Sequence, residues 1–131
     1  MSAIENIGRT WAPRLLSVLR IVVGLLFIEH GTSKLFGFPQ MPNSEGLALF
    51  SVIGLSAILE FVGGLLLTVG LFTRVTAFVL SGEMAVAYFV AHAPKGFFPL
   101  LNHGEPAILY CFVFLYLAAA GGGPWSIDSR R

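Results

Sequence analysis

The side chains of this protein that could do chemistry lie inside apolar segments. The stretch LRIVVGLLFIEHGTSKLFGF, residues 19–38, is interrupted by four ionisable side chains, Arg20, Glu29, His30 and Lys34. Two carboxylic acids, Glu60 and Glu83, interrupt later apolar segments in the same way. An ionised group costs about 2.5–3.5 kcal/mol at the centre of a membrane on insertion scales, so such groups face the protein interior and are candidates for function.

The depths of three of these groups predict that they meet. A rise of about 1.5 Å per residue puts Arg20 roughly 8 Å, Glu60 roughly 10 Å and Glu83 roughly 12 Å from one membrane boundary. We therefore expect a buried polar network of Arg20, Glu60 and Glu83, with one carboxyl group protonated because one arginine balances one negative charge. Two interpretations stay open: an ionic clamp that fixes the arrangement of the helices, or a site that binds a ligand or transfers protons.

A second polar cluster is predicted near the opposite, outer boundary. It forms a vestibule from residues at the ends of apolar segments: His30, Lys34, His92, Asn102, His103 and Glu105. The apolar loop residues expected to cover it are Phe97, Phe98 and Leu100. Histidine and carboxylate side chains can bind zinc, but this spacing matches no known metal motif, so no metal site is predicted. At about 100° per residue Glu29 points about 180° away from Arg20, toward the last apolar segment, the outer loop or another subunit.

The composition favours a membrane protein. Only 11% of the 131 residues are charged, against roughly 25% in a typical soluble domain, and the mean hydropathy is +0.82. The length is that of one domain. A net charge of +1 without a basic run argues against nucleic acid as a partner. The single cysteine, Cys111, excludes an internal disulfide and a CxxC motif, and its place within an apolar segment favours core packing.

Four segments are long and apolar enough to approach the length of about 20 residues that a membrane span requires. They are residues 15–36, 47–72, 75–93 and 106–120. The expected fold is all-α, an integral membrane four-helix bundle, antiparallel and up-down-up-down, forming a single domain over residues 1–131. Between the second and third segments, Gly70 is expected to end one helix and Thr73 to cap the next.

The basic residues near the segment ends predict the orientation. One side of such a bundle carries most of them, with two interfacial tryptophans: Arg9, Arg14, Arg74, Arg130, Arg131, Trp11 and Trp125. The other side carries only Lys34 and Lys95, so both termini are expected in the cytoplasm. The N-terminus lacks the pattern of a cleavable signal, and its apolar residues at helical spacing predict a segment that lies on the membrane surface.

Glycines share the helical faces that carry the buried polar groups. On the first segment this face holds Arg20, Gly24, Phe27, Gly31 and Lys34, and on the second it holds Ser56, Glu60, Gly63, Gly64 and Leu67. Small residues let two helix backbones approach closely in a membrane. These faces therefore predict tight helix packing, and they also fit a homodimer.

Three stretches together resemble the DoxX family of small bacterial membrane proteins. They are LRIVVGLLFIEHGTSKLFGF, LEFVGGLLLTVGLFTR and NHGEPAILYCFVFLYLAAAGGGPWSID, and the resemblance runs from about Leu15 to Asp128. The sequence GGGPWS departs from the family pattern, which is closer to Gly-Pro-Gly followed by a basic or aromatic residue. The resemblance implies a four-helix protein of the bacterial inner (plasma) membrane, connected with quinone-linked oxidation of sulfur compounds and with thiol and oxidative-stress systems. It carries over no catalytic residue.

The resemblance directs the functional prediction toward membrane redox chemistry. A quinone carbonyl needs hydrogen-bond donors, which Arg20, Lys34 and the histidines supply, and Glu60 and Glu83 could relay protons. The sequence shows no haem ligand pair, flavin motif or iron–sulfur cysteines, so electrons would come from a soluble redox partner. We therefore expect an accessory or quinone-interacting component of a membrane redox system. The alternatives are a small-solute or proton transporter, and a non-catalytic scaffold that recruits a redox enzyme.

Overall fold

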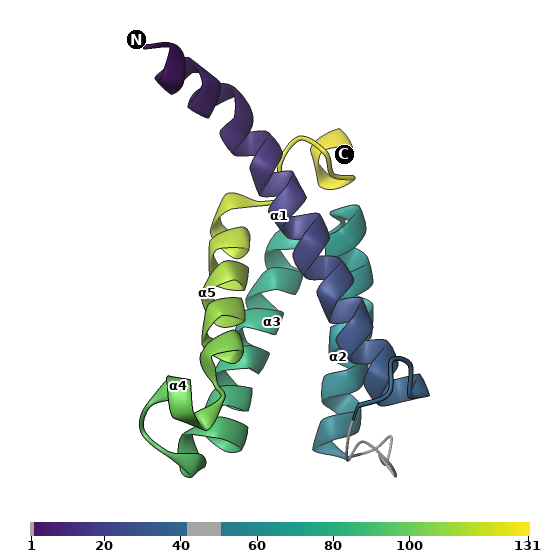
Figure 1. The fold of residues 1–131 in the computed structure, drawn as a ribbon. Coiled ribbons are helices and arrows are strands. Elements are labelled where there is room, and N and C mark those ends of the chain that lie inside the picture. Colours follow the sequence, from purple (N-terminus) through teal and green to yellow (C-terminus); the bar gives the residue numbers. More distant parts are fainter. Residues whose placement is uncertain (1, 42–50) are drawn as a thin grey trace.

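The structure, a computed structural model, describes residues 2–41 and 51–131 (Figure 1). Every regular element in these two ranges is helical, which confirms the all-α prediction. The elements are α1 (Ala3–Phe36), α2 (Val52–Val69), α3 (Thr73–Ala87), the π-helical turn η1 (Tyr88–His92), the 3-10 turn η2 (Ala93–Lys95), α4 (Pro99–Asn102), α5 (Glu105–Ala120) and the 3-10 turn η3 (Asp128–Arg130).

Three helical stretches in the described ranges are long and apolar enough to cross a membrane: Ala3–Phe36, Val52–Val69 and Thr73–Lys95. Helix α5 is apolar but has 16 residues, which at about 1.5 Å per residue is about 24 Å, against a hydrocarbon core of about 30 Å. Helix α1 begins at Ala3, where Ser2 and Glu5 form a capping box, so the N-terminal residues and the predicted span at residues 15–36 form one continuous helix. Residues 47–50 of the predicted second segment lie outside the described ranges.

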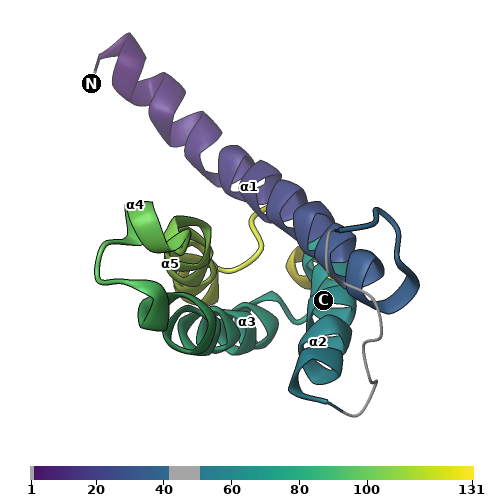
Figure 2. The same cartoon turned by 60° about the horizontal axis from the view of Figure 1, so that its bottom comes forward.

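The long helices form two pairs. Helix α1 packs along α2 and α3 packs along α5, while α2 and α3 touch over a shorter stretch. The pairs share a core at whose centre the rings of Phe27 and Phe114 meet edge to face, 4.7 Å between centroids. Figure 1 shows the pairs close together near the C-terminal segment and spread apart toward the end that carries α4, and Figure 2 shows α3 beside α5, apart from α1 and α2. We call these the closed end and the open end of the molecule.

Glycines bring the backbones of α1 and α2 into contact, as the sequence predicted. A Cβ atom on Gly31 would lie 2.6 Å from the Cα of Phe61, and one on Gly64 would lie 2.6 Å from the backbone nitrogen of Ile28. Backbone atoms in a packed helix cannot move aside for a methyl group, so only glycine allows this separation. The close approach of α1 and α2 determines which side chains of the two helices meet.

The C-terminal segment after α5 covers the closed end. The backbone N–H of Asp128 donates to the carbonyl of Gly70, which ends α2 in the left-handed conformation as predicted. The prediction that Thr73 caps α3 is wrong: Thr73 is the first residue of the helix, and the carboxylate of Asp128 accepts from the backbone N–H groups of Phe72 and Thr73 at 2.9 and 2.8 Å. Partial burial disfavours the charged form of Asp128, but Thr73, the N–H group of Phe72 and the nearby Arg131 together stabilise it more, so its pKa lies below its usual value.

Candidate functional site

Buried polar groups of three helices meet toward the open end. Lys34, in the last turn of α1, places its Nζ 2.9 Å from both carboxylate oxygens of Glu60 on α2. The Glu60 side chain is only 3% exposed, and that of Lys34 is 26% exposed. Lys34 reaches this position because Gly31, about one turn earlier, lets α1 lie against the backbone of α2. The result is a largely buried ion pair between the two helices.

Ser56 connects the carboxyl groups of two helices. It lies about one turn before Glu60, and its Oγ is 2.5 Å from Oε2 of Glu60 and 2.6 Å from Oε2 of Glu83 on α3. The Nζ of Lys34 is 3.3 Å from the same hydroxyl. The other oxygen of Glu83, Oε1, is buried and has no hydrogen-bond partner within the described ranges. Lys34, Ser56, Glu60 and Glu83 are called the carboxyl cluster below.

The expected network of Arg20, Glu60 and Glu83 is wrong for Arg20. The guanidinium is fully buried at the closed end, where its three nitrogens donate to the backbone carbonyls of Leu67 at 2.8 Å, Trp125 at 2.7 Å and Gly122. Arg20 and Lys34 are 14 residues apart, about 21 Å along α1. The predicted depths placed Arg20 too close to the carboxyl groups, and they could not reveal that backbone carbonyls already satisfy it.

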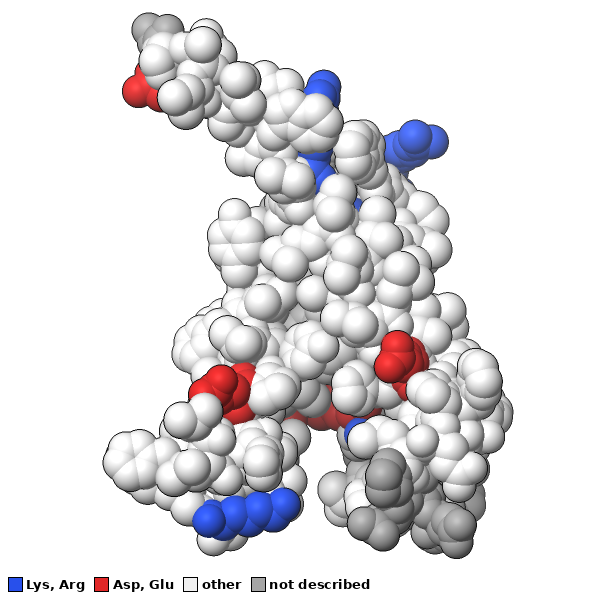
Figure 3. All heavy atoms as spheres, in the orientation of Figure 1, with Lys and Arg blue, Asp and Glu red and all other residues white. Residues whose placement is uncertain are grey.

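A cavity of about 200 Å³ lies beside the carboxyl cluster. Its polar lining side chains come from both helix pairs and from η1: His30, Lys34, Ser56, Glu60, His92 and Tyr110. Phe27 and Met84 contribute apolar walls. Figure 3 shows the molecule hollowed between the two pairs at the open end, with acidic and basic atoms at the top of the hollow. A small neutral ligand with polar edges would find both hydrogen-bonding groups and apolar surface in this cavity.

His92 enters the cavity lining from the π-helical turn η1. Single π-helical turns occur frequently at functional sites, because they displace a side chain from its regular helical position. The Nδ1 atom of His92 lies 3.0 Å from the carbonyl oxygen of Asn102. A carbonyl only accepts hydrogen bonds, so Nδ1 is the donor, and in the neutral ring Nε2 is left with a lone pair. His92 is therefore a candidate hydrogen-bond acceptor for a ligand.

The rest of the predicted vestibule does not gather at this cavity. Asn102 is fully buried in the loop before α5, where its side chain bonds to the Tyr88 hydroxyl and to backbone atoms of Gly96 and Gly104. The remaining vestibule and roof residues are exposed, and none of them lines the cavity in the described ranges: His103, Glu105, Phe97, Phe98 and Leu100. Asn102 organises the loop because a buried amide must satisfy its donors and acceptor. Glu29 is exposed on α1.

Sequence reasoning missed two residues of the site. Ser56 was placed on the face of Glu60 but not recognised as the bridge to Glu83, although a serine four residues before a buried carboxylic acid is a usable signal. Tyr110 carried no signal, because an aromatic residue in an apolar segment is usually core packing. In the structure the Tyr110 ring meets Phe27 edge to face at 4.9 Å and lines the cavity.

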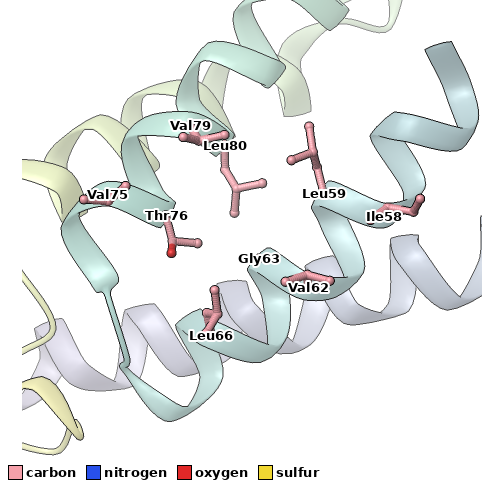
Figure 4. Close-up of a pocket in the computed structure, with 9 residues that line it drawn as sticks. All are labelled: Ile58, Leu59, Val62, Gly63, Leu66, Val75, Thr76, Val79 and Leu80. Atoms are coloured by element: carbon pink, nitrogen blue, oxygen red, sulfur yellow. The ribbon is translucent and has the colours of Figure 1, made fainter.

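A second depression lies between α2 and α3, with a volume of about 260 Å³ (Figure 4). Its lining is almost entirely hydrocarbon, and Figure 4 shows Leu59 and Leu80 directed toward its middle. Among the described residues that line it, only Thr76 has a polar side chain. This groove offers shape to an apolar chain but no group for chemistry. The smaller, polar cavity is therefore the candidate site.

Fold and site together define a class: a small helical membrane protein with a buried Lys–Ser–Glu–Glu cluster beside a polar cavity. A family model described as DoxX matches residues 15–93. The chain belongs to the DoxX family, as its sequence suggested. The region matched by the family model stops before α5, whereas the resemblance seen in the sequence was expected to continue to Asp128.

Several bacterial relatives match most of the chain. An uncharacterized protein of Haemophilus influenzae is 45% identical over 124 residues, covering 92% of each chain. Inner membrane protein YqjF of Escherichia coli is 30% identical and covers 98% of this chain and 95% of its own. A Bacillus subtilis protein with the name "Putative oxidoreductase CatD" is 30% identical, covering 85% and 82%. No solved structure matches the chain.

Proposed function

We propose that this protein is a component of a redox system in the bacterial inner membrane, and that its polar cavity binds the head group of a quinone-class carrier. One domain of four antiparallel helices would span the membrane up-down-up-down, with both termini in the cytoplasm. In this orientation the cavity opens toward the outer side. The names of two relatives support this proposal. The Escherichia coli protein is called an inner membrane protein, which supports the location, and the Bacillus subtilis protein is called "Putative oxidoreductase CatD", which supports the reaction class.

The observation that carries the proposal is the mixture of donors and acceptors on the cavity wall. The hydroxyl of Tyr110 can donate a hydrogen bond, as a quinone carbonyl requires, and Lys34 can donate a second one in exchange for its long 3.3 Å contact with Ser56. Nε2 of His92 can accept a hydrogen bond from a quinol hydroxyl. Phe27 and Met84 provide apolar surface for the ring. A site that holds both oxidation states of a carrier needs both kinds of group.

The electrons would have to pass through a partner. The sequence has one cysteine, and among the residues that the structure describes no cluster of three or more His, Cys, Asp or Glu side chains could hold a metal ion. The protein would therefore act as the membrane-embedded quinone site for a soluble redox protein, either as one chain or as a homodimer. Its own residues would bind and orient the carrier and exchange protons with it.

The test is binding of a short-chain quinone to the purified protein in nanodiscs, measured by calorimetry, with two matched tyrosine variants. Tyr110→Phe removes only the hydroxyl of a side chain that lines the cavity, and a lost neutral hydrogen bond of about 0.5–1.5 kcal/mol corresponds to an affinity about two- to tenfold lower. Tyr116→Phe is the control, because Tyr116 lies on the same helix but is 59% exposed. Equal affinity of both variants and the parent, or no binding at all, would contradict the proposal.

Transport is the second candidate, and the hollow between the helix pairs is the feature that favours it. A transporter would move protons or a small solute into liposomes that contain only this protein. Flux that depends on Glu60 without any quinone binding would replace the redox proposal by this one. A scaffold role would show neither binding nor flux, and only capture of the soluble enzyme.

A further inference from the structure

We propose that Ser56 joins Glu60 and Glu83 into a store for a single proton, which passes between the two carboxyl groups through the serine hydroxyl. The inference concerns the protein alone and does not require that the ligand is a quinone. It rests on the short contacts of the carboxyl cluster, on its charge and on the position of the cavity.

The short contacts of Ser56 require one hydrogen atom more than the cluster would have if both carboxyl groups were ionised. The Ser56 hydroxyl has one hydrogen, yet carboxyl oxygens lie 2.5 and 2.6 Å from its Oγ. Only one of these contacts can use the serine hydrogen, so the other carboxyl group must carry a hydrogen of its own. The remaining neighbour, Lys34, only donates. Two short contacts to one hydroxyl thus require one protonated carboxyl group.

The charges lead to the same count. Lys34 contributes one positive charge, and two ionised carboxylates would leave a net charge of −1 in the protein interior. An uncompensated buried charge is costly, and neutralisation by a proton is the usual response. With one proton on the carboxyl pair the cluster is neutral. The other titratable side chains around the cavity are His30 on α1, His92 on η1 and Tyr110 on α5.

The contacts also place the proton in the resting state. Lys34 Nζ lies 2.9 Å from both oxygens of Glu60, which is the arrangement of an ammonium group with a carboxylate. Glu83 has no such partner: Oε2 contacts Ser56, and Oε1 is buried without a hydrogen-bond partner in the described part of the chain. Glu83 is therefore the acid, which donates to Ser56, while Ser56 donates to Glu60.

Transfer needs only two short movements of hydrogen. The O–H bond of Glu83 breaks as its hydrogen joins Oγ of Ser56, and the original serine hydrogen passes to Oε2 of Glu60. Serine is unchanged at the end, the net charge stays zero, and the proton has moved from α3 to α2. Glu60 lines the cavity, whereas Glu83 is not among the residues that line it in the described ranges. The proton thus moves from a position behind Ser56 to one that faces the occupant.

Infrared spectroscopy of the full-length protein in lipid nanodiscs tests this, with no ligand added. The parent should show, at neutral pH, the carbonyl stretching band of a protonated carboxylic acid, where an ordinary carboxyl group is ionised. Glu83→Gln should abolish the band, since glutamine has nearly the shape of the protonated acid and keeps a hydrogen to donate. Glu105→Gln, which changes an exposed carboxyl group at the start of α5, should leave the band unchanged.

Ser56→Ala supplies the second measurement. Without the hydroxyl the band should shift in frequency, because the acid loses its acceptor, and its exchange with deuterium from solvent should slow. Absence of the band in the parent, its survival in Glu83→Gln, or unchanged exchange in Ser56→Ala would each overturn the inference. Since no quinone is present, failure of quinone binding leaves these results intact, and failure of these results leaves quinone binding intact.

Discussion

Lys34→Met should destabilise the protein strongly, because it leaves Glu60 buried without its cation. The lysine donates to both oxygens of Glu60 at 2.9 Å, and the Glu60 side chain is 3% exposed. Breaking a buried ion pair by removal of one partner costs about 3–5 kcal/mol. Glu60 can reduce this cost by taking a proton, so we expect the lower part of that range, about 3 kcal/mol.

The interaction energy between Lys34 and Glu60 tests their contact more directly than the effect of the single variant does. Glu60→Gln removes the charge that Lys34→Met leaves unpaired, so the double variant should recover much of the loss, with an interaction energy on the order of 2 kcal/mol. Arg20 provides the comparison, because its guanidinium donates to the three backbone carbonyls of Leu67, Gly122 and Trp125. Arg20→Met and Glu60→Gln should therefore add to within about 0.5 kcal/mol.

The assay is reversible unfolding in mixed micelles by titration with sodium dodecyl sulfate, followed by tryptophan fluorescence. Lys95→Met is the control, since this lysine lies in η2 on the exposed loop and should change the free energy of unfolding by less than about 0.5 kcal/mol. Strong coupling of Arg20 with Glu60, together with additive effects of Lys34 and Glu60, would refute the geometry of the carboxyl cluster and restore the network expected from the sequence.

Three further predictions concern the scaffold. Gly31→Ala should lower the free energy of unfolding by about 1–3 kcal/mol, because the new Cβ would lie 2.6 Å from the backbone of Phe61. Gly82→Ala is the control: no atom lies within 4 Å of its new Cβ, so it should be neutral or stabilising. Burial raises the pKa of Asp128, but its contacts with Thr73, Phe72 and Arg131 lower it more, and the lowered pKa adds stability at pH values above about 4. This stability should be lost as pH falls through the lowered pKa, and Asp128→Asn should abolish that part of the pH dependence of unfolding. Arg20→Lys should lower the unfolding temperature, because an ammonium group cannot match the planar spread of three acceptors.

Helical periodicity predicted the faces of the helices well. The glycines and polar residues assigned to one side of α1 and α2 are largely buried, and the glycine contacts join the two backbones. The fourth apolar segment matches α5 to within one residue at its start. Faces follow from about 100° of rotation per residue, which depends only on the presence of a helix and not on where it begins.

Axial position was harder to predict, and the Arg20 error came from it. Glu60 lies twelve residues from the predicted segment end at residue 72, which at about 1.5 Å per residue is about 18 Å from that boundary and not about 10 Å. Arg20 instead lies level with Leu67, whose carbonyl it contacts. Long-range bonds from a side chain to the backbone leave no pattern in a sequence. Arg20 to the carbonyl of Gly122 and Asp128 to the N–H of Thr73 are both of this kind.

Buried charge serves different purposes at the two ends of the molecule, and this difference indicates where a ligand would act. At the closed end every nitrogen of Arg20 has a backbone acceptor, so a ligand could only replace bonds that already exist. Toward the open end Oε1 of Glu83 has no partner in the described ranges, and Ser56 donates its one hydrogen to Glu60 while it accepts one from Glu83. Rearrangement there moves one proton from Glu83 to Glu60 at the cost of the Lys34–Glu60 ion pair, and it changes the charge that faces the cavity. A binding event at this end can therefore be coupled to proton movement, whereas the arginine can only hold the helices together.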